Sequence, residues 1–575
     1  MLLFRKNTIS LLLAAGLATI SSFAYASQPH ETSLSGNFLA SRSAALSRDN
    51  EAAAEYLASA LKQDPGNANI IERLFQIRLS TGNLGEAERL AEDVLSFNSQ
   101  QRMARIVLGL KEFRNRRYEQ ARQHFSEAAY TPVGELTSAL LSAWAYAGEG
   151  SLNAAMTELD KLDGNESFAN FKSFHAALIA DYLGSSIRAD AAYKKAYQEA
   201  GTSLRVTQAY GDFLKRSKRV ADAEKVYRSF LEGGDSNAMI EKALAQLNDG
   251  DTSKPFIQDA GAGAGEALFS LTAAMNDDQS IDVALLYAQL ALSFNADKPV
   301  MLTMLGDILS GTQRYEAAIA AYEKIPASSE LRTNADTEIA VNLQRMDKGV
   351  DAQARIRGIV TREPNNFEAW VTLGNIHRNN DQFVEAADAY TSALKLVQTP
   401  SRNQWSIFYY RGIAFERQKK WAESEADFRK ALELSTDEAS VLNYLGYSLI
   451  DKNMKLDEAI AMVKKAVELK PNDGYIVDSL GWAYFQLRDF EQAVEHLERA
   501  VDLKAGDPII AEHLGDAYWR VGRTLEAKFQ WQHAKDNKPE PEDLKRIEDK
   551  LKSGMLDLPP LVKPAENGAS GTTNG

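Results

Sequence analysis

The 575-residue sequence contains no cysteine. Thiol catalysis, disulfide bonds, iron–sulfur clusters and thiolate zinc sites are therefore excluded, and so is the lipidated cysteine that anchors bacterial lipoproteins. A basic surplus is missing too, because the formal net charge is −14. Phosphate binding needs a basic surface, so nucleic acid is not expected as a partner.

Long apolar runs are absent after the N-terminus. Residues 1–26 resemble a secretory signal, with a basic start, an apolar stretch over 9–20 and an A-x-A motif at 24–26. The apolar stretch is shorter than the about 20 residues that cross a bilayer. We therefore expect cleavage between Ala26 and Ser27, export to the periplasm of a Gram-negative cell without lipidation, and no integral membrane span.

Motifs of catalysis and of metal binding are also missing. The seven histidines include no H-E-x-x-H pattern, and no two of them are paired at metal-binding spacing on one helix face. The glycine-rich stretch 261–265 fits neither the dinucleotide nor the phosphate-loop pattern. We therefore expect a protein that is not an enzyme and that holds no cofactor and no metal.

What the sequence does contain is an internal repeat of about 34 residues. It is marked by a mostly small residue, here called the pivot. The pivots are Ser41, Phe75, Gly109, Ala143, Ala177, Gly211, Thr272, Gly306, Ala340, Gly374, Gly412, Gly446, Gly481 and Gly515. Twelve residues after the pivot (thirteen after Gly446) stands a second small residue, which is alanine in all repeats but one: Ala53, Ala87, Ala121, Ala155, Ala189, Ala223, Ala284, Ala318, Ala352, Ala386, Ser424, Ala459, Ala493 and Ala527.

Within each repeat the apolar residues follow helical spacing, interrupted once by a short polar turn. In the repeat of Gly481 the turn falls at residues 487–489, and Ala493 and Leu497 lie on the second helix. Small residues at the pivot and at the alanine position allow the two helices to approach closely, whereas a bulky side chain would overpack the contact.

A 34-residue unit of two helices, with small and large residues in this order, resembles the tetratricopeptide repeat (TPR) family. The resemblance implies an all-α fold: a right-handed superhelical solenoid of about 14 helix-turn-helix repeats, with a concave face lined by the first helix of each pair. Because no single repeat buries its own apolar face, neighbouring repeats must stack.

The repeat is interrupted once, where residues 248–265 have the composition of turns and linkers. We read this segment as a break between two superhelical arms. The predicted divisions are a signal peptide (1–26), an N-terminal TPR arm (27–247), a linker (248–265), a C-terminal TPR arm (266–540), a charged capping helix (541–556) and a disordered tail (557–575).

Surplus aromatic residues gather in three consecutive late repeats. Tyr447 and Trp482 directly follow their pivots, while Phe485 and Trp519 lie four residues after theirs. Tyrosine and tryptophan supply much contact area with few rotatable bonds, as in the hot spots of interfaces. The predicted partner-binding surface comprises Asn443, Tyr447, Asp478, Trp482, Phe485, Glu512, Asp516, Trp519 and Arg520, continued by a polar cluster of Asn375, Arg378, Tyr409 and Arg417. In the alternative interpretation, the rings stack between neighbouring repeats and stiffen the array.

Three runs within this region, residues 442–448, 475–482 and 512–519, look like a family of large periplasmic TPR proteins. Relatives of that family include lipoproteins that bind carboxyl-terminal processing proteases and present peptidoglycan hydrolases to them. The resemblance implies a scaffold or adaptor that binds a periplasmic protease or a peptidoglycan hydrolase and supports the integrity of the cell envelope. The missing lipidated cysteine departs from this pattern. The alternative function is a component of a machine that exports exopolysaccharide or assembles outer-membrane proteins, because TPR arrays serve such machines too.

Overall fold

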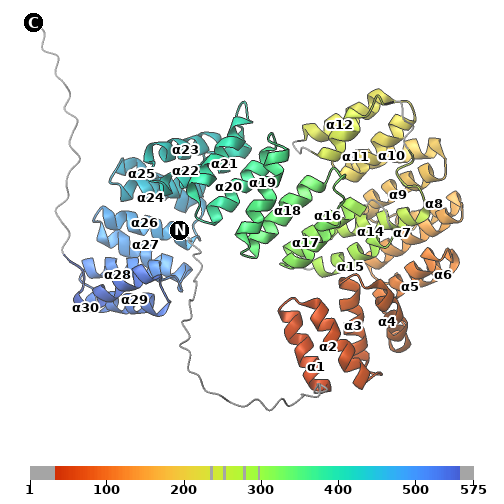
Figure 1. The fold of residues 1–575 in the computed structure, drawn as a ribbon, viewed down its shortest axis with the longest axis horizontal. Helices are drawn as coiled ribbons and strands as arrows, with labels where there is room; N and C mark the ends of the chain where they lie inside the picture. Colours follow the sequence, from red (N-terminus) through yellow and green to blue (C-terminus); the bar gives the residue numbers. More distant parts are fainter. Residues whose placement is uncertain (1–32, 234–236, 250–253, 276–279, 295–297, 557–575) are drawn as a thin grey trace, which may run out of the picture. The chain divides into compact units, whose positions relative to one another are not determined.

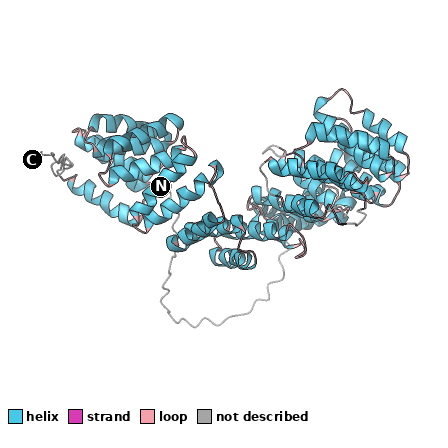
Figure 2. Ribbon diagram, turned by 90° about the horizontal axis from the view of Figure 1, so that it is seen from above, coloured by secondary structure: helices cyan, strands magenta, loops and turns pink. Residues whose placement is uncertain are grey.

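The computed structural model describes residues 33–233, 237–249, 254–275, 280–294 and 298–556. These residues form 30 α-helices and two 3-10 turns (Glu166–Phe168 and Arg402–Gln404), and they include no β-strand (Figures 1 and 2). The all-α prediction is confirmed. The predicted signal peptide and tail lie outside the described residues.

The chain divides into two compact units, and each is described by itself. The N-terminal unit ends at Pro364 and the C-terminal unit begins at Asn365.

The helices of the N-terminal unit are α1 (Leu34–Leu46), α2 (Asn50–Gln63), α3 (Ala68–Ser80), α4 (Leu84–Phe97), α5 (Arg102–Arg114), α6 (Tyr118–Glu127), α7 (Pro132–Gly148), α8 (Leu152–Asp160), α9 (Ala169–Tyr182), α10 (Ser186–Ala200), α11 (Leu204–Arg216), α12 (Val220–Glu232), α13 (Ala238–Ala245), α14 (Ala260–Ala274), α15 (Ile281–Leu292), α16 (Lys298–Gly311), α17 (Tyr315–Glu323), α18 (Arg332–Arg345) and α19 (Gly349–Arg362).

Those of the C-terminal unit are α20 (Phe367–Asn379), α21 (Phe383–Lys395), α22 (Trp405–Arg417), α23 (Trp421–Leu434), α24 (Ala439–Asp451), α25 (Leu456–Leu469), α26 (Gly474–Gln486), α27 (Phe490–Leu503), α28 (Pro508–Arg520), α29 (Thr524–Asp536) and α30 (Pro541–Ser553).

All but α13 and α30 form 14 helix hairpins, nine in the N-terminal unit and five in the C-terminal unit. Every predicted pivot lies buried on the first helix of a hairpin. Every residue of the alanine position lies on the second helix and is 0% exposed. The predicted repeat register and the number of repeats are therefore confirmed.

The pivot is small because a large side chain from the second helix packs directly on it. A Cβ added to Gly109 would lie 2.4 Å from a ring carbon of Phe125, and one added to Gly515 would lie 2.5 Å from the indole of Trp531. Real Cβ atoms do not approach other atoms so closely. The ring or aliphatic chain sixteen or seventeen residues after the pivot thus fixes how near the two helices come.

The turn between the two helices repeats as well. Seven residues after the pivot, the backbone adopts positive φ in 13 of the 14 hairpins, and the equivalent residue of the fourteenth lies outside the described part. Glycine takes this position in four hairpins, at Gly82, Gly150, Gly184 and Gly522. Elsewhere polar or charged residues such as Arg488 hold the left-handed conformation that ends the first helix.

The linker prediction is wrong for residues 260–265, which form the start of α14. Asp259 caps this helix by accepting a hydrogen bond of 2.8 Å from the backbone N–H of Ala262. The glycines of α14 serve close packing: a Cβ on Gly263 would lie 2.2 Å from the indole of Trp144 on α7. The segment that resembled a linker in composition is therefore the start of a helix, in which Gly263 allows close approach to Trp144.

The α14–α15 hairpin packs against first helices of earlier repeats, as Figure 1 shows for α7 and α14. Arg205 on α11 binds Glu266 on α14 through two hydrogen bonds of 3.0 and 2.6 Å, and Glu266 is 0% exposed. The hydroxyl groups of Thr137 on α7 and Tyr287 on α15 lie 3.0 Å apart. The first six hairpins and the α14–α15 hairpin accordingly share one hydrophobic core.

Substitution of Gly263 by alanine tests this packing. We expect Gly263→Ala to lower the free energy of unfolding by about 1–3 kcal/mol, because the new methyl group overlaps the buried Trp144 ring. The matched control is Gly85→Ala in α4, where no atom lies within 4 Å of the added Cβ and alanine is the better helix former. Thermal and denaturant unfolding would show the difference; equal stability of the two variants would contradict the docked position of α14.

Candidate protein-binding surface

The predicted surface residues lie on the first helices of the five hairpins in the C-terminal unit, α20, α22, α24, α26 and α28. Contacts between neighbouring first helices join six of them. Asn443 on α24 donates a hydrogen bond of 3.2 Å to Ser479 on α26, and its Oδ1 is buried without a hydrogen-bond partner. Tyr447, one turn further along α24, lies close enough to Asp478 that burial and this carboxylate raise its pKa to about 12.

Trp482 and Asp478 on α26 both contact His513 on α28. The Trp482 ring stacks on His513 with ring centres 4.0 Å apart, and on Phe485 with ring centres 4.6 Å apart. His513 Nδ1 lies 2.9 Å from Asp478 Oδ1. Burial alone would lower the pKa of His513, but the charge of Asp478 and the hydrogen bond to it outweigh burial, and the pKa is raised above 6.5.

Glu512 and Asp516 face the protein's own capping helix, α30. Arg546 donates two hydrogen bonds to Glu512, of 2.7 and 2.6 Å, and Lys550 bridges both carboxylates at 2.6 Å. Glu512 is 1% exposed and Asp516 is 3% exposed. These two acidic residues therefore hold α30 in place rather than lining an open surface. Burial would raise the pKa of Glu512, but Arg546 and Lys550 lower it overall.

Three further predicted residues also make intramolecular contacts. Phe485 is buried within the core cluster of the last repeats. Trp519 packs against Trp531, with ring centres 5.4 Å apart, and against Gly554 just after α30. Arg520 donates a hydrogen bond to the carbonyl oxygen of Leu556. Phe485 and Trp519 therefore pack within the fold, in part against rings of their own hairpins.

The second polar cluster is joined by ring contacts. The Arg378 guanidinium lies 4.2 Å from the ring centre of Tyr410, and Tyr409 meets Tyr444 of α24 edge to face at 6.0 Å. Asn375 accepts a hydrogen bond of 2.8 Å from Tyr390, a ring that packs on the pivot Gly374. Arg417 lies 3.7 Å from Glu416 and over the ring of Phe383. This cluster therefore extends from α20 to α24.

Sequence reasoning missed His513, Arg546 and Lys550. A signal for all three exists, because contacts between successive first helices join residues about one repeat apart. Arg546 and Lys550 each follow their partners by 34 residues, and His513 follows Asp478 by 35. Helix α30 thus occupies the register of a fifteenth first helix.

Within the described ranges, no three histidine, aspartate or glutamate side chains gather as a metal site. No helix in the same part of the chain is long and apolar enough to cross a membrane.

Sequence profiles of the tetratricopeptide repeat family match residues 44–107, 300–325, 338–403, 409–474 and 479–533. The chain contains tetratricopeptide repeats. The matched ranges lie in both units.

Two proteins share part of this TPR sequence. The TPR repeat-containing protein PA4667 of Pseudomonas aeruginosa is 29% identical over 151 residues, which are 26% of this chain and 24% of that protein. The human protein O-mannosyl-transferase TMTC1 is 24% identical over 185 residues, which are 32% of this chain and 21% of that protein. The chain thus spans about a quarter or less of the length of these relatives.

Solved structures also match over most of the chain. The Cut9–Hcn1 hetero-tetramer of the APC/C gives a TM-score of 0.38 at 14% identity, with coverage of 90% of this chain and 95% of the matched chain. Yeast Tom70 gives 0.34 at 14% identity, with coverage of 91% and 95%.

The raised pKa of His513 makes the contribution of its ion pair depend on pH. A group whose pKa is raised on folding stabilises the fold fully below its unfolded pKa, and this contribution is lost as the pH rises through the folded pKa. We therefore expect Asp478→Asn to lower the Tm more at about pH 5.5 than at about pH 9. The control is Asp502→Asn, which changes an exposed carboxylate on α27 and should have the same small effect at both pH values. A pH-independent loss in Asp478→Asn would contradict the ion pair.

Proposed function

We propose that this protein is an exported, non-enzymatic TPR scaffold whose C-terminal unit holds a protein partner on the first helices α24, α26 and α28. One observation carries the proposal: Trp482 stacks on Phe485 and on His513 of the next first helix, Tyr447 interacts with the carboxylate of Asp478, and both rings are only partly buried. A preorganised aromatic side chain loses little conformational entropy on binding, which suits it to the centre of an interface.

The periplasm is the proposed location, on the strength of the signal-like sequence of residues 1–26. A carboxyl-terminal processing protease or a peptidoglycan hydrolase is the proposed partner, and cell-envelope integrity the proposed role. The resemblance of residues 442–448, 475–482 and 512–519 to periplasmic TPR adaptors supports this choice, and the partial match to PA4667 is consistent with it. The match to a transferase covers only 21% of that protein, so it supports the repeats and not a transferase activity.

Replacement of the two half-buried rings tests the surface. Trp482→Ala and Tyr447→Ala should each weaken partner binding by about 2 kcal/mol, roughly 30-fold, because each removes a preorganised contact. The matched control is Phe529→Ala on α29, which removes a ring that is 70% exposed on a second helix. Trp519→Ala, in contrast, should chiefly lower the Tm, because that ring packs on Trp531 and Gly554. Unchanged binding in both surface variants would contradict the proposal.

A pulldown from periplasmic extract with the wild-type chain and the Trp482→Ala variant identifies the partner. Recovery of a protease or peptidoglycan hydrolase by the wild type alone would support the adaptor role. Recovery of an exopolysaccharide or outer-membrane assembly complex would favour the alternative role. Recovery of neither after mild crosslinking would contradict both.

A further inference from the structure

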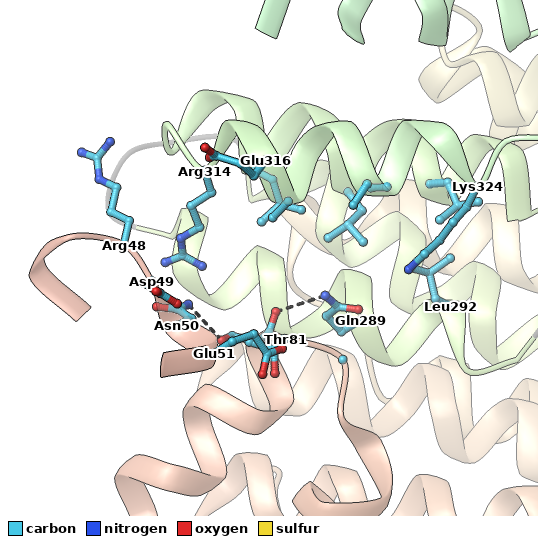
Figure 3. Close-up of a pocket in the computed structure, with 18 of the residues that line it drawn as sticks. Arg48, Asp49, Asn50, Glu51, Thr81, Gln289, Leu292, Arg314, Glu316 and Lys324 are labelled. Atoms are coloured by element: carbon cyan, nitrogen blue, oxygen red, sulfur yellow. Dashed lines mark hydrogen bonds between the residues drawn. The ribbon is translucent and has the colours of Figure 1, made fainter. Parts of the chain in front are cut away.

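The N-terminal unit contains a cleft that the predicted surface does not include. It lies between the turns that follow α1 and α3, on one side, and helices α15 to α17, on the other (Figure 3). Its volume is about 1030 Å³. Gln289 on α15 donates a hydrogen bond of 3.1 Å to the carbonyl oxygen of Ser80 and joins the two sides at the base.

The two sides of the cleft differ in chemistry. Helices α16 and α17 supply an apolar wall that includes Leu302, Leu305 and Leu309 and the exposed residues Ala317 and Ala320. The facing wall is largely polar, because it consists of the residues of two interhelical turns. A ligand of the cleft must therefore present one apolar and one polar side.

The charged residues around the cleft leave a positive surplus, in a protein whose overall charge is −14. The cations are Arg48, Lys298, Arg314 and Lys324, and the anions are Asp49, Glu51 and Glu316. Two of these carboxylates are engaged within the fold: Asp49 accepts a hydrogen bond of 3.0 Å from the backbone of α2, and Glu51 pairs with Arg78 at 3.3 Å. Figure 3 shows Arg48 and Arg314 at one end of the cleft and Lys324 at the other.

Arg314 is a largely buried cation whose ion pair is weak. Its side chain is 19% exposed, and its ion pair with Asp282 is long, at 3.7 Å, and formed with a carboxylate that is 83% exposed. Such a pair contributes little. Burial and the charge of Arg48 both lower the pKa of Arg314. Since Arg48 and Arg314 repel each other, a carboxylate placed beside them would stabilise both.

The same unit contains an example of a helix packed on a surface of this kind. The apolar helix α14 packs on the first helices of earlier repeats and places one carboxylate, Glu266, on Arg205. An α-helix about 10–12 Å in diameter fills roughly 500 Å³ per turn, so the cleft has room for about two turns.

We propose that this cleft binds about two turns of an amphipathic helix from a partner protein, with apolar side chains on α16 and α17 and an acidic side chain on Arg48 and Arg314. This site lies in the N-terminal unit and is separate from the surface on α24, α26 and α28. It uses helix-in-groove recognition, in which apolar side chains three and four residues apart insert into the groove.

A photocrosslinker identifies the occupant. p-Benzoylphenylalanine is placed at Ala320 in the full chain and, as a matched control, at Ala354, an exposed alanine at the same repeat position on α19. After irradiation in the producing cells, the crosslinked segment is sequenced and synthesised as a peptide. We expect crosslinking at Ala320 only, to a segment of another protein with apolar residues three and four apart and at least one aspartate or glutamate.

The synthetic peptide then tests the contacts. Ala320→Trp should fill the cleft and weaken peptide binding at least tenfold, and Arg314→Gln should do the same by removing the charge while leaving the apolar wall intact. Ala354→Trp and Trp482→Ala should leave the Kd of the peptide unchanged. The proposal for the cleft is therefore tested independently of the proposal for the surface of the C-terminal unit. Three results would overturn the proposal. One is equal crosslinking at Ala320 and Ala354, and another is a crosslinked segment that lacks the pattern or comes from this chain itself. The third is peptide binding that survives Ala320→Trp and Arg314→Gln.

Discussion

The structure depends on one contact, repeated in most hairpins: a small pivot on the first helix against a larger side chain sixteen or seventeen residues later on the second. In seven hairpins that side chain is an aromatic ring, and it leaves no room for a Cβ at Gly109, Gly211, Gly306, Gly374, Gly412 or Gly515. Where the pivot is the large Phe75, the residue sixteen positions later is the small Ala91, and both are 0% exposed. The sizes at the two positions are thus complementary, which keeps the helix separation in a narrow range.

The repeat also gives neighbouring first helices a common register. First helices of adjacent hairpins place residues about 34 positions apart side by side, as in Asp181 with Arg216, Ser310 with Arg345 and Asp478 with His513. The aligned residues of successive first helices form a surface that can contact a partner or another part of the same chain. In the N-terminal unit α14 and α15 cover first helices of earlier repeats, and at the end of the C-terminal unit α30 pairs with Glu512 and Asp516.

The repeat register could be predicted from the sequence because it rests on residue size at fixed spacing, which a single chain displays many times. The place of α14 could not, since the glycine-rich start of α14, whose Gly263 packs on Trp144, has the same composition as a linker. The partner-binding surface stays a prediction, and the contacts of its residues could be foreseen only in part. Helix assignment placed Tyr447 and Trp482 on first helices, but only the structure shows that Glu512 and Asp516 meet Arg546 and Lys550, and that Trp519 meets Gly554. Those contacts depend on how α30 packs, and their 34-residue spacing becomes a usable signal only once α30 is known to occupy the position of a further first helix.

In the hairpin of Phe75 and Ala91 the large residue is the pivot and the small one lies on the second helix. Exchanging these two residues tests most directly whether the sizes at the two positions must be complementary. Ala91→Phe alone should overpack the hairpin by about 1–3 kcal/mol, and Phe75→Ala alone should leave a cavity that costs about 3–5 kcal/mol. The double variant Phe75→Ala with Ala91→Phe has the small pivot and large partner of the other hairpins. Denaturant unfolding of the double variant should therefore show at least about 2 kcal/mol less destabilisation than the sum of the single variants. Strictly additive losses would contradict the account.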